Sequence, residues 1–173
     1  NLGKSKFKIN GIIEKEPDRM FSFATFGPRV LLSTESLIET GLLPGALLTN
    51  KYLKFICKNV FVKLNDKESK YFNNIKKNVL ELHIAHNDGS YFCTDDELKS
   101  LDDNDQVAVK YCSKNGEVNE NFNPNGSLNN IAGIFNKNKN ILGMMPHPER
   151  VIDQSLSSDD GSFFFKNLIE NLK

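Results

Sequence analysis

This sequence lacks an excess of charge of either sign. Its 173 residues include 22 Lys or Arg and 22 Asp or Glu, so the formal net charge at pH 7 is zero. Nucleic-acid binding depends largely on a basic surface that neutralises phosphates. We therefore expect no nucleic-acid partner.

Cysteine and long apolar runs are also scarce. The three cysteines, Cys57, Cys93 and Cys112, have spacings that match neither a zinc module nor a disulfide framework. No apolar run approaches the ~20 residues that cross a bilayer, and the first residues lack the apolar region of a signal peptide. We expect a cytoplasmic protein with reduced cysteines and no membrane partner. Since the sequence has no phosphate-binding loop and no metal-ligand spacing, we also expect no cofactor and no metal.

The chain length suits one domain over residues 1–173. After Lys54 the apolar residues fall in short segments rich in β-branched and aromatic side chains, separated by polar turns, which is typical of strands. The predicted strands are 55–64, 79–85, 106–112, 130–135 and 141–145. We expect the second and third to pair, and Asn115-Gly116 to close a hairpin.

Three helices are predicted from capping residues and apolar spacing. Thr94 is followed by acidic residues and begins a short helix that ends near Leu101. Ser33 or Thr34 begins another, which Gly41 ends. The last helix follows Ser157 or Ser158, and its apolar residues recur at helical spacing to form a stripe that should face the core: Phe164, Phe165, Leu168, Ile169 and Leu172.

A Pro-His-Pro sequence follows the last predicted strand. Pro146 and Pro148 favour an extended backbone around His147, and residues two apart in an extended chain project to the same side. Glu149 can therefore reach the His147 imidazole, fix its tautomer and stabilise its protonated form. This predicts a base with its orienting acid. The alternative, which spacing alone favours, is a Pro-rich turn with an exposed histidine.

Six short motifs occur along the chain: Gly-Leu-Leu-Pro-Gly-Ala-Leu-Leu (41–48), Lys-Phe-Ile-Cys-Lys (54–58), Ile-Ala-His (84–86), Asn-Pro-Asn-Gly-Ser (123–127), Asn-Ile-Ala-Gly-Ile (130–134) and Pro-His-Pro-Glu-Arg (146–150). Together and in this order they resemble the glutaminase subunit of phosphoribosylformylglycinamidine synthase, a class I glutamine amidotransferase. The resemblance covers residues 41–173, and residues 1–30 do not match. It implies a flavodoxin-like α/β sandwich with a strand-rich back half, truncated or rearranged at its N-terminus.

The resemblance also implies a function and a site. Such a subunit hydrolyses glutamine and passes ammonia to a synthetase subunit, which makes formylglycinamidine ribonucleotide in purine biosynthesis. His147 would be the base and Glu149 its orienting acid. His86 falls in a family loop near the active site, so it belongs to the site or an interface, or is simply a polar residue at a strand end. We interpret 123–127 as a turn.

The nucleophile that this chemistry needs is missing from its expected place. The family carries a cysteine in a Val-Leu-Gly-x-Cys-Asn-Gly-Phe-Gln elbow, whereas residues 30–38 read Val-Leu-Leu-Ser-Thr-Glu-Ser-Leu-Ile. Ser33 fits a helix cap better than a nucleophile. The three cysteines lie in or beside predicted strands, where we expect buried apolar behaviour.

Three functional hypotheses follow. The chain is a glutaminase subunit, or it is a catalytically inactive or fragmentary member that acts as a binding or scaffold subunit. An unrelated Ser or Cys hydrolase using His147 and Glu149 ranks last. For the chain alone, we predict no activity.

Overall fold

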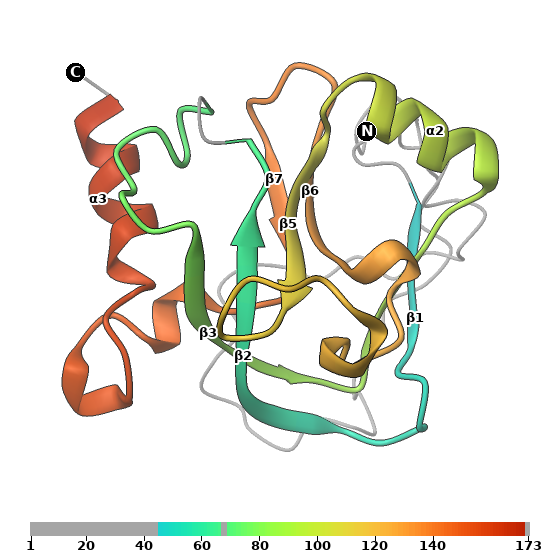
Figure 1. Cartoon of the computed structure of the whole chain (residues 1–173), viewed down its shortest axis with the longest axis horizontal. Helices are drawn as coiled ribbons and strands as arrows, with labels where there is room; N and C mark the ends of the chain where they lie inside the picture. The colour runs from blue at the N-terminus through green and yellow to red at the C-terminus, as the bar shows by residue number, and fades with distance from the viewer. Residues whose placement is uncertain (1–44, 67–68, 172–173) are drawn as a thin grey trace, which may run out of the picture. The chain divides into compact units, whose positions relative to one another are not determined.

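The computed structural model describes residues 45–66 and 69–171, all within one compact unit, Leu43–Lys173. Figure 1 shows a curled sheet with the C-terminal helix to its left and the other helix at its upper right. The helix expected after Ser33 or Thr34 lies outside the described residues, as does Leu172. The helices and strands are β1 (Ala46–Thr49), β2 (Ile56–Leu64), β3 (Val79–His86), β4 (Asp88–Phe92), α2 (Asp95–Asp103), β5 (Val107–Cys112), β6 (Ile131–Phe135), β7 (Leu142–Met144) and α3 (Ser162–Asn171). None of the helices in this part of the chain is long and apolar enough to span a membrane.

The five predicted strands are present, each within one or two residues of its expected bounds. They form one antiparallel sheet in the order β3-β2-β5-β6-β7, and β1 pairs with β4 in a separate two-stranded sheet. The expected pairing of 79–85 with 106–112 is wrong, because β2 lies between these strands and pairs with both. β2 is long enough to pair along both of its edges, and the alternation of apolar and polar residues within a strand does not show which strands are its neighbours.

The predicted hairpin turn and the turn after β6 differ in structure. The turn at Asn115-Gly116 exists, with the Gly116 N–H donating to the Ser113 carbonyl at 2.9 Å, but the described chain continues into a 3-10 turn (Glu120–Phe122) rather than a strand. The hairpin prediction for this dipeptide is therefore wrong. The polar segment after β6 does close the β6–β7 hairpin, where the Asn136 carboxamide oxygen accepts from the Asn140 and Ile141 amides, both at 3.0 Å.

Helix α2 begins where the capping pattern predicted and runs to Asp103, two residues beyond the expected end. The Glu97 amide donates to the Thr94 hydroxyl at 3.3 Å, and the Thr94 amide donates to the Glu97 carboxylate at 2.8 Å. This reciprocal pair of hydrogen bonds forms a capping box and satisfies two backbone amides that have no partner within the helix. Leu101 is the buried residue of the helix and anchors it to the sheet.

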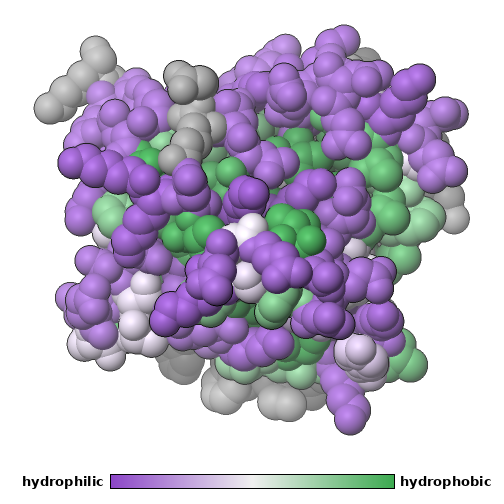
Figure 2. Space-filling view, in the orientation of Figure 1, coloured by the Kyte–Doolittle hydropathy of each residue, from purple (hydrophilic) through white to green (hydrophobic). Residues whose placement is uncertain are grey.

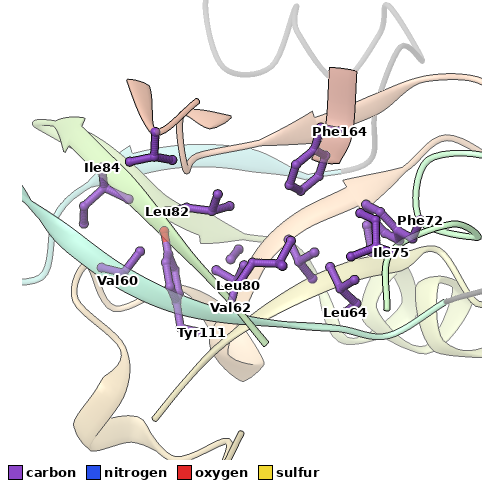
Figure 3. Packing of buried hydrophobic residues seen from close by; sticks show 14 of the residues in the cluster. Val60, Val62, Leu64, Phe72, Ile75, Leu80, Leu82, Ile84, Tyr111 and Phe164 are labelled. Carbon is purple, nitrogen blue, oxygen red and sulfur yellow. The ribbon is translucent and has the colours of Figure 1, made fainter. Parts of the chain in front are cut away.

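The core lies on one face of the β2–β3 pair. Alternate residues of the two strands point inward, and the aromatic residues Phe72, Tyr111 and Phe164 complete the packing, as Figure 3 shows. Phe164 of α3 meets Phe72 edge to face, with ring centroids 5.6 Å apart. A shift of one residue in register would turn this apolar face outward, so the alternation fixes the register. In Figure 2, the face of the molecule in view is largely hydrophilic, with apolar side chains showing between polar ones.

The predicted core-facing stripe of the last helix is only partly correct. Phe164 is buried, but Phe165 and Ile169 are 41% and 63% exposed. The inner face instead includes Asn167, whose carboxamide accepts from the Asn74 amide at 3.1 Å and donates to the Lys70 carbonyl at 2.6 Å. A carboxamide suits this position because it both accepts from a backbone amide and donates to a backbone carbonyl of the loop before β3.

Candidate active site

The segment that carries His147 joins the two edges of the five-stranded sheet. His147 is the third residue after the end of β7, and its amide donates to the His83 carbonyl on β3 at 2.7 Å. In a flat sheet these edges would lie about 19 Å apart, since neighbouring strands are about 4.8 Å apart. Three residues span at most about 10 Å. The sheet must therefore curl, and this curl brings the Pro-His-Pro loop against β3.

His147 and Glu149 form the contact that the sequence predicted. The Glu149 carboxylate lies 2.8 Å from Nδ1 of His147. Pro148 begins a 3-10 turn (Pro148–Arg150), a position where the missing amide hydrogen costs nothing. Because a carboxylate only accepts, the proton sits on Nδ1 and Nε2 is left to take a proton. The side chains are 32% and 55% exposed, so a small substrate can reach them.

A glycine allows this turn to pack closely. The Gly161 amide donates to the Val151 carbonyl at 2.8 Å, and a Cβ at Gly161 would overlap the Pro148 carbonyl oxygen. The neighbouring Asp160 is buried and accepts from the Glu81 amide of β3 at 2.8 Å. The loop before α3 is thus fixed to β3 and supports the His147 turn from behind.

His86 is an interior residue. Its side chain is only 7% exposed, with Nδ1 lying 3.1 Å from the Asn50 carboxamide oxygen and Nε2 lying 3.4 Å from the Asn125 amide nitrogen. Burial lowers the pKa of His86, so its neutral form is favoured. A Cβ at Gly89 would overlap the ring, which shows how closely the backbone approaches it. This environment resembles a satisfied core histidine more than a catalytic one.

Sequence reasoning missed the partners of His86. The 123–127 segment is a turn, as predicted, but Asn125 within it is fully buried. Its amide nitrogen donates to the Gly89 carbonyl at 2.7 Å and to the Tyr111 hydroxyl at 3.0 Å. In the sequence, Pro124 and Gly126 indicate a turn but not the burial of Asn125 between them. Asn50 had no local signal at all.

The three cysteines do not supply a nucleophile to His147. Cys93 and Cys112 are buried as expected, and burial raises the pKa of both thiols, that of Cys112 to about 11. Cys57 is exposed, which contradicts the expectation of a buried strand cysteine. Its sulfur lies 3.4 Å from Nε2 of His83. Within residues 45–66 and 69–171, no cysteine hydrogen-bonds to His147.

Other kinds of site find little support in the described part of the chain. No group of three or more His, Cys, Asp or Glu residues there is arranged to hold a metal. A cleft of about 320 Å³ lies beside the start of β5, and its lining, which includes Leu101, Asp102 and Lys139, contains neither His147 nor Glu149. The His147 turn remains the best candidate for chemistry.

Comparisons with known proteins agree on one family. Residues 31–161 match the model of the CobB/CobQ-like glutamine amidotransferase domain. The chain is 60% identical, over 157 residues, to phosphoribosylformylglycinamidine synthase subunit PurQ of Pelagibacter ubique, with 89% of this chain and 69% of the relative covered. It is 44% identical over 136 residues to the PurQ subunit of Aquifex aeolicus, with 78% and 60% covered.

A solved structure shares the fold. The chain resembles one in the structure of PurLQS from Thermotoga maritima with a TM-score of 0.63 and 34% identity, over 79% of this chain and 57% of that one. The predicted fold class, a class I glutamine amidotransferase-like α/β fold with a strand-rich back half, is thereby confirmed. The chain spans about six-tenths to seven-tenths of the length of the relatives named here.

Proposed function

The chain belongs to the PurQ family of glutamine amidotransferases, and from this premise we propose that it is the glutamine amidotransferase subunit of phosphoribosylformylglycinamidine synthase, with His147 and Glu149 as base and orienting acid. The observation that carries the proposal is the 2.8 Å contact between Nδ1 of His147 and the Glu149 carboxylate. The substrate would be glutamine, the partner the synthetase subunit, and the location the cytoplasm.

The geometry suits the proton transfers of amide hydrolysis. A thiolate attacks the glutamine side-chain amide, and the departing nitrogen must receive a proton to leave as ammonia. Nε2 of His147 is the atom that would hold that proton. Glu149 would keep the imidazole in the required tautomer and stabilise its protonated form.

A second candidate function is favoured by the placement of the cysteines. Residues 30–38 contain no Cys, and the exposed Cys57 contacts His83 instead of His147. A subunit without a nucleophile would bind its partner but not hydrolyse glutamine. We keep the prediction that the chain alone is inactive, and we treat turnover as the question that the first experiment decides.

The experiment measures ammonia and glutamate released from glutamine by the purified chain, with and without the synthetase subunit. In parallel, a glutamine-mimicking chloroketone is added and the labelled peptide is mapped by mass spectrometry. Glu149→Gln serves as the matched variant, since it keeps the size of the side chain but removes its charge. Ammonia release that this variant lowers, with a label on one residue that excess glutamine prevents, establishes the glutaminase and identifies its nucleophile. No release and no glutamine-protected label from a folded chain establishes the binding subunit.

A partner surface is suggested by exposed apolar residues in and after β1. Leu47 and Leu48 are 49% and 44% exposed on opposite faces of the two-stranded sheet, and Tyr52, Leu53 and Phe55 are 65%, 79% and 62% exposed. Leu53 also has a positive φ of 53°, which is strained for a leucine. Clustered apolar exposure marks interaction surfaces. We assign the exposed segment after β1, with Tyr52, Leu53 and Phe55, to contact with the synthetase subunit, and we call these three residues the β1 patch.

Two single substitutions test the β1 patch. Tyr52→Ser removes a large apolar contact from the patch, and Ile169→Ser removes a similarly exposed one (63%) from α3. The expected result is that Tyr52→Ser weakens binding to the synthetase subunit in a sedimentation or calorimetric assay, whereas Ile169→Ser does not. Equal affinities for wild type and Tyr52→Ser would remove the patch from the interface.

A further inference from the structure

We propose that Cys57 is a thiol modification site, at which His83 and Asn59 assist the formation of a mixed disulfide with a small disulfide compound. The three side chains lie on the solvent-facing side of the β2–β3 pair, opposite the core. This proposal does not depend on glutamine hydrolysis, since none of the three residues belongs to the His147–Glu149 pair.

The strand register brings the three side chains together. Asn59 of β2 is directly opposite His83 of β3, and Cys57 lies two residues before Asn59 on the same face. The Cys57 sulfur is 3.4 Å from Nε2 of His83, and Nδ1 of His83 is 2.9 Å from the Asn59 carboxamide oxygen. A thiol, an imidazole and a carboxamide in this order form an array in which a base serves a nucleophile and a third group orients the base.

Hydrogen bonds on Asn59 determine which nitrogen of His83 faces the thiol. The Asn59 amide nitrogen donates to the Glu81 carboxylate and to the Ser157 hydroxyl, both at 2.9 Å. Its oxygen therefore points to His83 and accepts the Nδ1 hydrogen. Nε2 then carries the lone pair and accepts the thiol hydrogen of Cys57. The array is oriented for removing that proton.

The charge state of His83 agrees with this role. Burial lowers the pKa of His83, and the nearby Arg150 and His147 lower it further. The imidazole is accordingly neutral in neutral solution and is free to take a proton. Cys93 and Cys112 are buried and have no such neighbour, so Cys57 is the reactive cysteine of the described residues.

The surroundings favour disulfide exchange over acyl transfer. Around Cys57, β2 pairs with β3 along one edge, and its pairing with β5 begins only at Phe61. Amide or ester hydrolysis requires backbone amides that converge on a developing oxyanion, and an extended strand does not form this arrangement, because its successive amides point to opposite edges. Exchange with a disulfide needs no such donors, because the departing sulfur carries the negative charge itself.

The exchange balances without a further reagent. The Cys57 thiol gives its proton to Nε2 of His83, and the thiolate attacks one sulfur of the small disulfide. A new sulfur–sulfur bond forms to Cys57 as the original one breaks. The departing thiolate takes the proton from His83 and leaves as a thiol. Cys57 is oxidised, and one half of the small disulfide is reduced.

The test uses the full chain and glutathione disulfide as the probe, with the site of labelling mapped by mass spectrometry. Wild type is expected to be modified at Cys57, and Cys57→Ser to remain unmodified under native conditions. His83→Gln should slow the reaction by at least about tenfold at neutral pH, because it removes the group that accepts the thiol proton. Lys63→Gln, an exposed change farther along β2, should leave the rate unchanged.

A conservative variant separates orientation of the base from mere structure. Asn59→Asp, combined with Glu81→Gln so that two carboxylates do not face each other, keeps an oxygen that accepts the Nδ1 hydrogen and should retain at least the wild-type rate. Asn59→Leu should slow the reaction as His83→Gln does. Circular dichroism confirms that each variant is folded. The proposal is overturned if wild type and His83→Gln react at the same rate, or if Cys93 or Cys112 is labelled before Cys57.

Discussion

Asn50 offers a sharp test of how this fold is stabilised. Its side chain is fully buried and uses all of its hydrogen-bonding capacity. The amide nitrogen donates to the carbonyls of Lys54 and His86, both at 2.8 Å, and the oxygen lies 3.1 Å from both Nδ1 of His86 and the Gly89 amide. Asn50→Ala removes all four bonds at once and leaves their partners in place.

The size of the effect depends on which hydrogen-bond partners of Asn50 remain inaccessible to water after the substitution. The bond to Lys54 is only partly buried, so water can replace it, whereas the three bonds to His86 and Gly89 are buried. Each buried group left without a partner costs about 1–3 kcal/mol. With some relaxation, Asn50→Ala should lower the free energy of unfolding by about 3–5 kcal/mol, a large part of the roughly 5–15 kcal/mol typical of a domain.

The assay is equilibrium unfolding in urea followed by circular dichroism. Asn87→Ala is the matched control, because it makes the same change at an exposed position nearby and should cost no more than about 0.5 kcal/mol. If Asn50→Ala costs less than about 1 kcal/mol, the buried hydrogen bonds of Asn50 do not hold β1 and β3 together.

Four further changes test other parts of the structure by the same unfolding assay. Gly89→Ala should lower stability by about 1–3 kcal/mol, because its Cβ would overlap the enclosed ring of His86. Gly161→Ala should cost at least as much, because its Cβ would overlap the Pro148 carbonyl, and it should also weaken any chemistry of the adjacent turn. Thr94→Ala should cost about 1 kcal/mol through loss of the helix cap; a cost near zero would contradict the capping role. Because the pKa of His86 is lowered in the folded protein, the unfolded chain binds a proton more readily. The stability present above about pH 6.5 is therefore lost as the pH falls toward the folded pKa. His86→Gln should lose less stability than wild type between about pH 7.5 and pH 5.5.

The sequence was most informative where the cause of structure is local. Alternating apolar residues placed the five strands within two residues, and the Thr94 capping pattern placed the start of α2. The His147–Glu149 contact was also predicted, although the expected extended backbone holds only at His147, because Pro148–Arg150 forms a 3-10 turn. In each case the interacting groups are neighbours in the chain, so the spacing of residues is enough.

The tertiary structure decided what depends on distant residues. Strand order, which placed β2 between β3 and β5, cannot be read from alternation because any two apolar faces can share a core. The exposed Phe165 was predicted to be buried, since helical spacing does not show which side meets a loop that needs Asn167.

The same limit applies to the polar clusters. Asn50, His86 and Asn125 are separated by 36 and 39 positions, and Cys57 and His83 by 26, yet each set lies within hydrogen-bonding distance. The sequence by itself determined the strands, the cap and the histidine–glutamate pair. Only the curl and register of the sheet decided which side chains lie beside them, because such contacts form between segments whose separation along the chain carries no signal of their proximity in space.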